Sequence, residues 1–136
     1  MHNKFNKESW KDIEGYEGLY QISNLGKVRS LNRIVQGTND YFQKGIELKP
    51  IDNGKYLFVT LRKNGNKKIF YIHRLVAEYF VDNPNNYNEV NHIDENKHNN
   101  SYNNLEWCTH KYNANYGTRN ERIAKNKQKA GGTDEG

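Results

Sequence analysis

The chain has 136 residues, of which only 34% are hydrophobic, and its formal net charge of +5 is compatible with a polyanionic partner. The single cysteine, Cys108, excludes an intrachain disulfide and a zinc ribbon built from paired cysteines. No apolar run approaches the length of a membrane span, so we expect one small cytoplasmic domain with short appendages and no membrane partner.

The first predicted element is a small hairpin within "SWKDIEGYEGLYQISNLGKVRSL", residues 9–31. Two short apolar runs, 19–23 and 28–31, flank Asn24-Leu25-Gly26, which is typical of a tight turn. Residues 32–46 contain "QGTNDY", a cluster of turn-forming residues, and therefore predict a loop.

The second predicted hairpin lies within residues 56–72, where two β-rich runs flank an Asn64-Gly65 pair. Both faces of these runs carry apolar or aromatic side chains, so we expect the hairpin to be covered on both sides. The apolar spacing then becomes helical over residues 75–80, and Asn83-Pro84 predicts the end of that helix.

The third stretch, residues 89–117, predicts a strand, a long polar loop, a returning strand over "LEWCT" and a short helix. Thr109 can cap this helix and Gly117 can close it. Asn91 and His92 are adjacent on the first strand, so their side chains should point to opposite faces.

This arrangement brings a strand end close to the first turns of the closing helix, which carries Asn113. One side chain could hold a metal ion there while His92 points towards a water molecule. A hard cation with oxygen ligands and an imidazole base suit hydrolysis of a phosphodiester. Few protein ligands are needed, because magnesium keeps bound waters and takes phosphate oxygens from its substrate.

Four blocks of the sequence, "HRLVAEYF", "VNHIDENKHNN", "NNLEW" and "THKYNAN", resemble the HNH endonucleases in order and approximate spacing. The likeness is close to the phage homing-endonuclease type. Residues 9–31 resemble the modular DNA-binding segment that often precedes this nuclease domain. The resemblance implies an α+β fold, in which N-terminal β-hairpin segments precede a ββα-metal (His-Me finger) nuclease domain.

The resemblance also implies roles for individual residues. His92 matches the family's general base, and Asn104 matches the asparagine that braces the loop and orients that histidine. Asn91 and Asn113 match the ligands of a divalent metal ion, for which we expect Mg2+, with Mn2+ as the alternative. His73 matches a histidine ahead of the helix, with either a structural role or a place near the phosphate.

The expected partner is double-stranded DNA, and the candidate contacts are basic side chains spread along the chain. They are Lys27, Arg29, Arg33, His73, Arg74, His110, Arg119, Arg122 and Lys125. The last three belong to a basic carboxy-terminal arm, which is the strongest candidate for phosphate contacts.

The expected division of the chain has four parts. Residues 1–8 form a flexible terminus, 9–50 the DNA-binding β segment, 51–117 the nuclease domain, and 118–136 the basic arm with a disordered tail. One site per chain predicts that a monomer nicks one strand. A double-strand break would require a dimer or two encounters.

Two residues depart from the family pattern. Asn91 offers a neutral oxygen where a carboxylate is frequent, which should lower the affinity for metal. Glu95 stands where glycine is usual. If this position requires a positive φ, the glutamate costs about 1 kcal/mol.

Two other readings of the sequence stay open. A DNA-binding protein could keep the nuclease scaffold after losing useful metal affinity at Asn91. An RNA-binding or purely structural module is a third reading, but it leaves the arrangement of His92, Asn104 and Asn113 unexplained.

Overall fold

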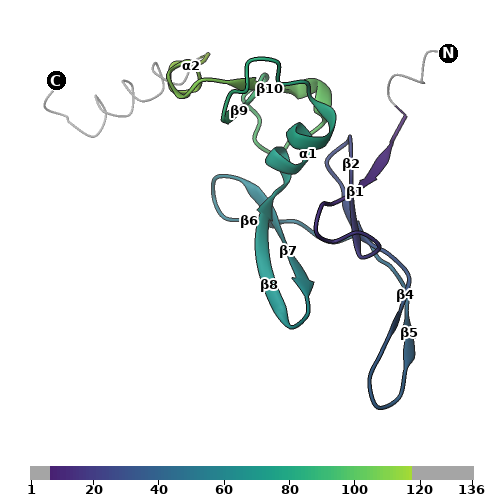
Figure 1. Ribbon diagram of the computed structural model, residues 1–136. Coiled ribbons are helices and arrows are strands. Elements are labelled where there is room, and N and C mark those ends of the chain that lie inside the picture. Colours follow the sequence, from purple (N-terminus) through teal and green to yellow (C-terminus); the bar gives the residue numbers. More distant parts are fainter. Residues whose placement is uncertain (1–6, 118–136) are drawn as a thin grey trace, which may run out of the picture.

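A computed structural model describes residues 7–117, so the predicted arm with Arg119, Arg122 and Lys125 lies outside the described residues. Strands β1 to β8 precede helix α1, and strands β9 and β10 lie between α1 and helix α2 along the chain (Figure 1). The elements are β1 (Trp10–Asp12), β2 (Tyr20–Ser23), β3 (Val28–Ser30), β4 (Arg33–Val35), β5 (Tyr41–Gln43), β6 (Ile51–Asp52), β7 (Leu57–Lys63), β8 (Asn66–Tyr71), α1 (Ile72–Phe80), β9 (Glu89–His92), η2 (Tyr102–Asn104), β10 (Leu105–Cys108) and α2 (His110–Ala114).

The first predicted hairpin is confirmed and forms part of an antiparallel sheet in the order β1-β2-β3. Ile22 and Val28 pair across β2 and β3, and both side chains are fully buried in the core. The turn between them needs glycine for two reasons. Gly26 has a φ of 89°, and a Cβ there would lie 3.1 Å from both the Cβ and the backbone oxygen of Asn100.

The loop predicted over residues 32–46 is wrong, because this stretch holds a second hairpin made of β4 and β5. The turn-rich "QGTND" is the connection of that hairpin. Its strands have only three residues each, too short to show an alternating pattern. Ile34 and Phe42 pair across the two strands and both remain more than half exposed.

The hairpin around Asn64-Gly65 is confirmed, with positive φ values at both turn residues. The expectation that it is covered on both sides is wrong. Val59 and Leu61 of β7 are fully buried on one face, whereas Ile69 of β8 is 54% exposed. Most of β8 therefore faces solvent, and the apolar residues there did not indicate a second covering layer.

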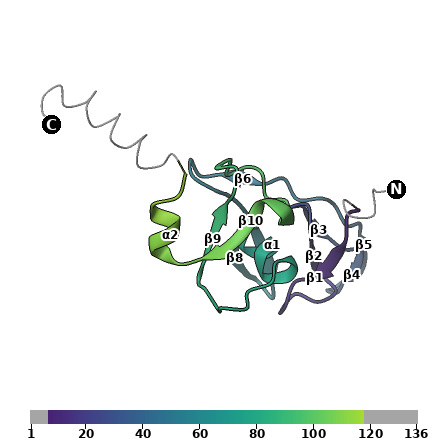
Figure 2. The ribbon, with the colours of Figure 1, turned by 90° about the horizontal axis from the view of Figure 1, so that it is seen from above.

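Helix α1 follows β8 without a connecting loop and ends three residues before Asn83-Pro84. Its buried residues Ile72, Leu75, Val76 and Ala77 form the centre of the core. In the view from above, α1 lies between the β1-β2-β3 sheet and the β9–β10 pair (Figure 2). Within residues 7–117, neither helix is long and apolar enough to cross a membrane.

The predicted order of strand, long loop, strand and helix is confirmed for residues 89–114. Strands β9 and β10 are antiparallel, with Asn91 opposite Glu106 and His92 opposite Leu105. Thr109 caps α2, because its side-chain oxygen accepts a hydrogen bond from the backbone N–H of Tyr112. This ββα unit makes the fold α+β, as predicted.

The turn at Gly26 provides a test of how the N-terminal sheet supports the β9–β10 loop. Gly26→Ala should lower the free energy of unfolding by about 2 to 4 kcal/mol, because the positive φ and the crowding against Asn100 add up. Gly15→Ala is the matched control: its φ is 86° but nothing lies within 4 Å of the new Cβ. Equal losses in urea denaturation would show that the contact with Asn100 is unimportant.

Candidate active site

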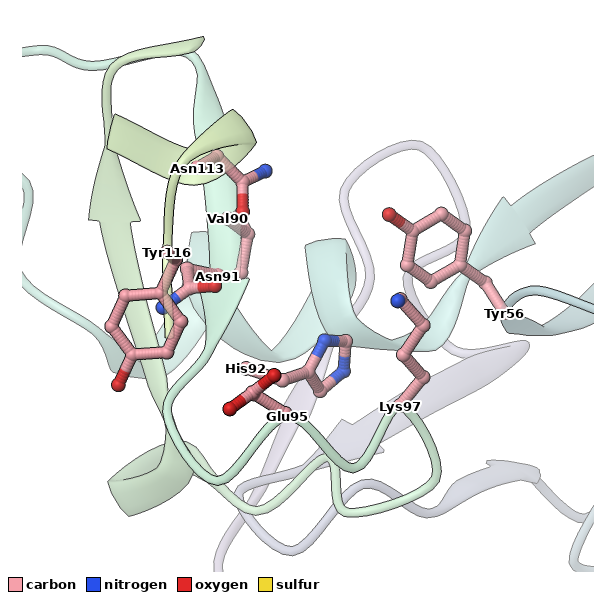
Figure 3. A pocket seen from close by; sticks show the side chains of 8 residues that line it. All are labelled: Tyr56, Val90, Asn91, His92, Glu95, Lys97, Asn113 and Tyr116. Carbon is pink, nitrogen blue, oxygen red and sulfur yellow. The ribbon is translucent and has the colours of Figure 1, made fainter. Parts of the chain in front are cut away.

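A pocket opens beside the end of β9, and four parts of the chain line it (Figure 3). Strand β9, the loop after it, the end of α2 and the residue before β7 each contribute side chains. The lining residues are Tyr56, Val90, Asn91, His92, Glu95, Lys97, Asn113 and Tyr116. The pocket thus unites three of the four predicted central residues, His92, Asn91 and Asn113.

Asn91 and His92 diverge as the strand geometry predicts. The His92 ring lies towards α1, with its centroid 5.2 Å from that of His73. The Asn91 side chain donates a hydrogen bond to Glu106 and lies on the side of β9 that faces α2. Because both residues sit where β9 ends, the two side chains still reach the same pocket.

The His92 ring is buried and fixed on one edge by Asn100. Its Nε2 lies 2.7 Å from Asn100 Oδ1, which can only accept a hydrogen bond, so Nε2 carries the hydrogen and Nδ1 keeps its lone pair. Burial lowers the pKa of His92, the hydrogen bond to Asn100 opposes this, and Lys97 adds to the lowering. The neutral ring with a free lone pair is the form that can accept a proton.

Asn104 braces the loop after β9 but does not contact His92. Its Oδ1 accepts from the Asp94 backbone N–H at 3.0 Å, and its Nδ2 donates to Asp94 Oδ1 and to the Asn99 carbonyl, both at 2.9 Å. The side chain that hydrogen-bonds to the imidazole is that of Asn100. The orienting role predicted for Asn104 stays a prediction, and it would act through the loop that presents Asn100.

Asn91 and Asn113 each use the amide nitrogen to bind a glutamate. Asn91 Nδ2 donates to Glu106 Oε2 at 2.7 Å, and Asn113 Nδ2 donates to Glu89 Oε1 at 3.0 Å. With the nitrogens fixed in this way, the two amide oxygens lie on the pocket side (Figure 3).

Two oxygen donors fit a hard divalent cation better than a soft one. Among residues 7–117 there is no group of three or more His, Cys, Asp and Glu side chains that could hold a metal ion. A site for zinc, which takes nitrogen and sulfur ligands, is therefore not formed by this part of the chain. Magnesium or manganese fits, since such ions complete their shell with water and phosphate oxygens.

His73 lies inside α1, with only 6% of its surface exposed, and stacks on Tyr56 with the ring centroids 4.5 Å apart. Burial lowers its pKa to about 3, with smaller contributions from the positive charge of His92, Arg74 and Lys97. A ring that stays neutral at physiological pH is not a cationic phosphate ligand. Of the two roles left open for His73, its burial supports the structural one.

Within residues 7–117, the other predicted DNA contacts do not line the pocket, and several are bound to neighbouring residues. Arg29 donates two hydrogen bonds to Gln21 and lies 3.9 Å above the Trp10 ring. Arg74 donates to the Asn88 carbonyl and His110 pairs with Glu89. In the N-terminal part, Lys27 is exposed and Arg33 is half-buried.

The site residues that the sequence did not indicate include Tyr56, Lys97 and Asn100. Lys97 lines the pocket, and its ammonium lies 5.7 Å from the centre of the Tyr56 ring. Lys97 and Asn100 follow the histidine in a polar stretch whose composition gave no means to rank one residue above another. Tyr56 reaches the site from a distant segment, so no local pattern could indicate it.

Glu95 has a φ of 64°, so the position does require the left-handed conformation. Its carboxylate lies beside Gly117, where an added Cβ would meet Glu95 Oε2. The expected strain is therefore present, and the loop with Lys97 and Asn100 begins from this strained residue.

A ββα unit that brings a strand histidine and a helix asparagine to one pocket defines the ββα-metal class of folds. The chain belongs to the HNH endonuclease family: that family matches residues 70–115, and the NUMOD4 motif matches residues 8–62. The predicted family, including its N-terminal module, is confirmed.

Several known proteins are similar to this chain. The DNA endonuclease I-HmuI of Bacillus phage SP01 is 42% identical over 105 residues, which cover 76% of this chain and 54% of that protein. Two uncharacterized HNH endonucleases of Acanthamoeba polyphaga mimivirus, L245 and L247, are 41% and 37% identical over 82% and 89% of this chain. The matches cover 30% and 29% of those proteins, so the chain spans about half or less of its curated relatives.

A solved structure of the HNH homing endonuclease I-HmuI, described as showing DNA binding and cleavage, is also similar. It has a TM-score of 0.66 and 37% sequence identity, over 86% of this chain and 66% of that chain. The likeness extends over both the N-terminal sheet and the ββα unit.

The buried His73 predicts a dependence of stability on pH. His73 has a pKa of 6.5 in the unfolded chain, whereas its pKa in the folded chain is about 3. The contribution of neutral His73 to the free energy of unfolding is therefore fully present above pH 6.5 and is lost as the pH falls towards 3. At pH 5 the loss should approach about 2 kcal/mol. His73→Phe should flatten the pH dependence in urea denaturation, and a slope equal to that of the wild type would contradict the assignment.

Proposed function

We propose that this chain is a metal-dependent endonuclease that hydrolyses phosphodiester bonds in double-stranded DNA and nicks one strand per encounter. The observation that carries the proposal is the meeting of His92, Asn91 and Asn113 at one pocket. Membership of the HNH endonuclease family and likeness to I-HmuI support the same reaction. A general base beside two oxygen ligands is the minimum needed for hydrolysis with a hard cation.

In the proposed reaction, Nδ1 of His92 takes a proton from a water molecule. The resulting hydroxide attacks phosphorus in line with the 3′ oxygen and the P–O3′ bond breaks. The leaving 3′ oxygen takes a proton from a second water molecule, and a 5′ phosphate and a 3′ hydroxyl result. Asn91 and Asn113 would hold the divalent ion, for which we propose Mg2+. When bound, such an ion offsets charge on the phosphate and on the leaving 3′ oxygen.

We assign two tasks to Lys97. Its positive charge helps keep His92 unprotonated between turnovers, because protonation there would place two cations together. It also lines the pocket with the two asparagines, where an ammonium can bind a non-bridging phosphate oxygen (Figure 3). A positive charge placed at the phosphate is worth most in the transition state, where negative charge accumulates.

For DNA binding we propose that residues 9–50 and the basic arm contact the duplex, while residues 51–117 form the nuclease domain. Lys27, Arg29 and Arg33 would contribute on the N-terminal sheet, and Arg119, Arg122 and Lys125 in the arm. The net charge of +5 favours such contacts. We propose a monomer with one site, which accounts for nicking.

A DNA-binding protein without catalysis is the second candidate. The observation that favours it is the neutral ligand pair, since Asn91 brings no formal charge to the metal. Tight DNA binding without any cleavage in magnesium or manganese would establish this alternative.

His92→Ala should reduce nicking of supercoiled plasmid by about 100-fold to 10,000-fold, because a general base contributes this much to the rate. Binding of the same DNA in a mobility-shift assay should stay near the wild-type level. His98→Ala is the matched control, since His98 lies in the same loop but is exposed and bonded to Asp52. Wild-type nicking by His92→Ala, or nicking in excess EDTA, would refute the mechanism.

Lys97→Met should lower the maximal nicking rate by about 10-fold to 100-fold, because one preorganised charge at the reacting phosphate is lost. Lys55→Met is the control, since the Lys55 ammonium lies 5.5 Å from the same Tyr56 ring but does not line the pocket. Equal effects of the two substitutions on single-turnover rates would show that Lys97 acts only as one of many surface charges.

A further inference from the structure

Two carboxylates stand directly behind the amides of the proposed metal ligands. Glu106 is opposite Asn91 in the β9–β10 register, and Glu89 lies two residues before Asn91, on the same face of β9. The contacts are 2.7 Å from Asn91 Nδ2 to Glu106 and 3.0 Å from Asn113 Nδ2 to Glu89. Neither glutamate lines the pocket itself.

A hydrogen bond of this kind does two things to an amide. It selects one of the two orientations that differ by exchange of oxygen and nitrogen, and so fixes the oxygen on the pocket side. It also draws the N–H bond towards a negative charge, which increases the electron density on the oxygen. A neutral ligand backed by a carboxylate therefore approaches the donor strength of an anionic ligand.

Glu89 is shared between Asn113 and His110, whose Nδ1 is 3.1 Å from Glu89 Oε2. Glu106 makes the shorter contact with its asparagine and should have the larger effect.

We propose that Glu106 and Glu89 are positioning residues that make Asn91 and Asn113 effective ligands for a divalent cation. The negative charge that an aspartate would bring at position 91 is supplied instead by Glu106, one residue further from the ion. This inference rests on the proposed metal site. It explains how a pocket with two neutral ligands can hold magnesium or manganese.

The test is a titration of the full chain with Mn2+, in which electron paramagnetic resonance measures the concentration of the free ion. Plasmid nicking is measured in parallel at increasing Mn2+ concentrations. Glu106→Gln keeps an oxygen acceptor but removes the charge, and it should weaken Mn2+ binding by about 10-fold. Glu89→Gln should weaken it less. The Mn2+ concentration that gives half-maximal nicking should rise in the same order, more for Glu106→Gln than for Glu89→Gln.

The controls separate this inference from the function on which it rests. Glu78→Gln alters an exposed residue of α1 and should leave Mn2+ binding unchanged. The double variant Asn91→Asp with Glu106→Gln moves the charge onto the ligand and should restore affinity to the wild-type level or above.

Wild-type Mn2+ affinity in Glu106→Gln, or a loss that the double variant does not restore while its thermal unfolding is normal, would overturn the positioning role. A wild type that binds no Mn2+, or an Asn91→Ala variant that binds it as tightly as the wild type, would contradict the metal site itself. The proposed mechanism would then be wrong as well.

Discussion

The site depends on one buried asparagine that joins the two parts of the molecule. Asn100 bonds the His92 ring at 2.7 Å, and its Cβ packs against the turn at Gly26 in the N-terminal sheet. The backbone N–H of Tyr102 donates to the Asn24 carbonyl beside it at 2.8 Å. The loop that presents the proposed base is thus held from the β1-β2-β3 sheet as well as from its own domain. The N-terminal module therefore positions the proposed base, in addition to the DNA binding proposed for it.

A second constraint is that few side chains in the pocket carry a formal charge. Burial and Lys97 lower the pKa of His92, and the proposed ligands Asn91 and Asn113 carry no formal charge. The carboxylates of Glu106 and Glu89 accept hydrogen bonds from the amide nitrogens of these two asparagines and do not line the pocket. This arrangement avoids placing several bare anions together where a phosphate must enter. The proposed metal site therefore contains no cluster of three or more acidic, cysteine and histidine side chains among residues 7–117.

The parts of the fold that the sequence predicted are those fixed by local chemistry. Asn64-Gly65 marked a hairpin and Thr109 marked a helix start, because turn and cap preferences act over a few residues. Hairpin β4–β5 was missed because its strands are too short to show a pattern. Asn100 and Tyr56 could not be predicted, since both acquire their role from segments far away along the chain.

The proposed mechanism requires a divalent ion between Asn91 and Asn113, beside the lone pair of His92. The most direct measurement is the anomalous diffraction of Mn2+ in crystals of the full chain with a DNA duplex. One strong peak is expected at bonding distance from the Oδ1 atoms of both asparagines and from a phosphate oxygen. A peak elsewhere, with DNA cleaved in the same crystals, would contradict it.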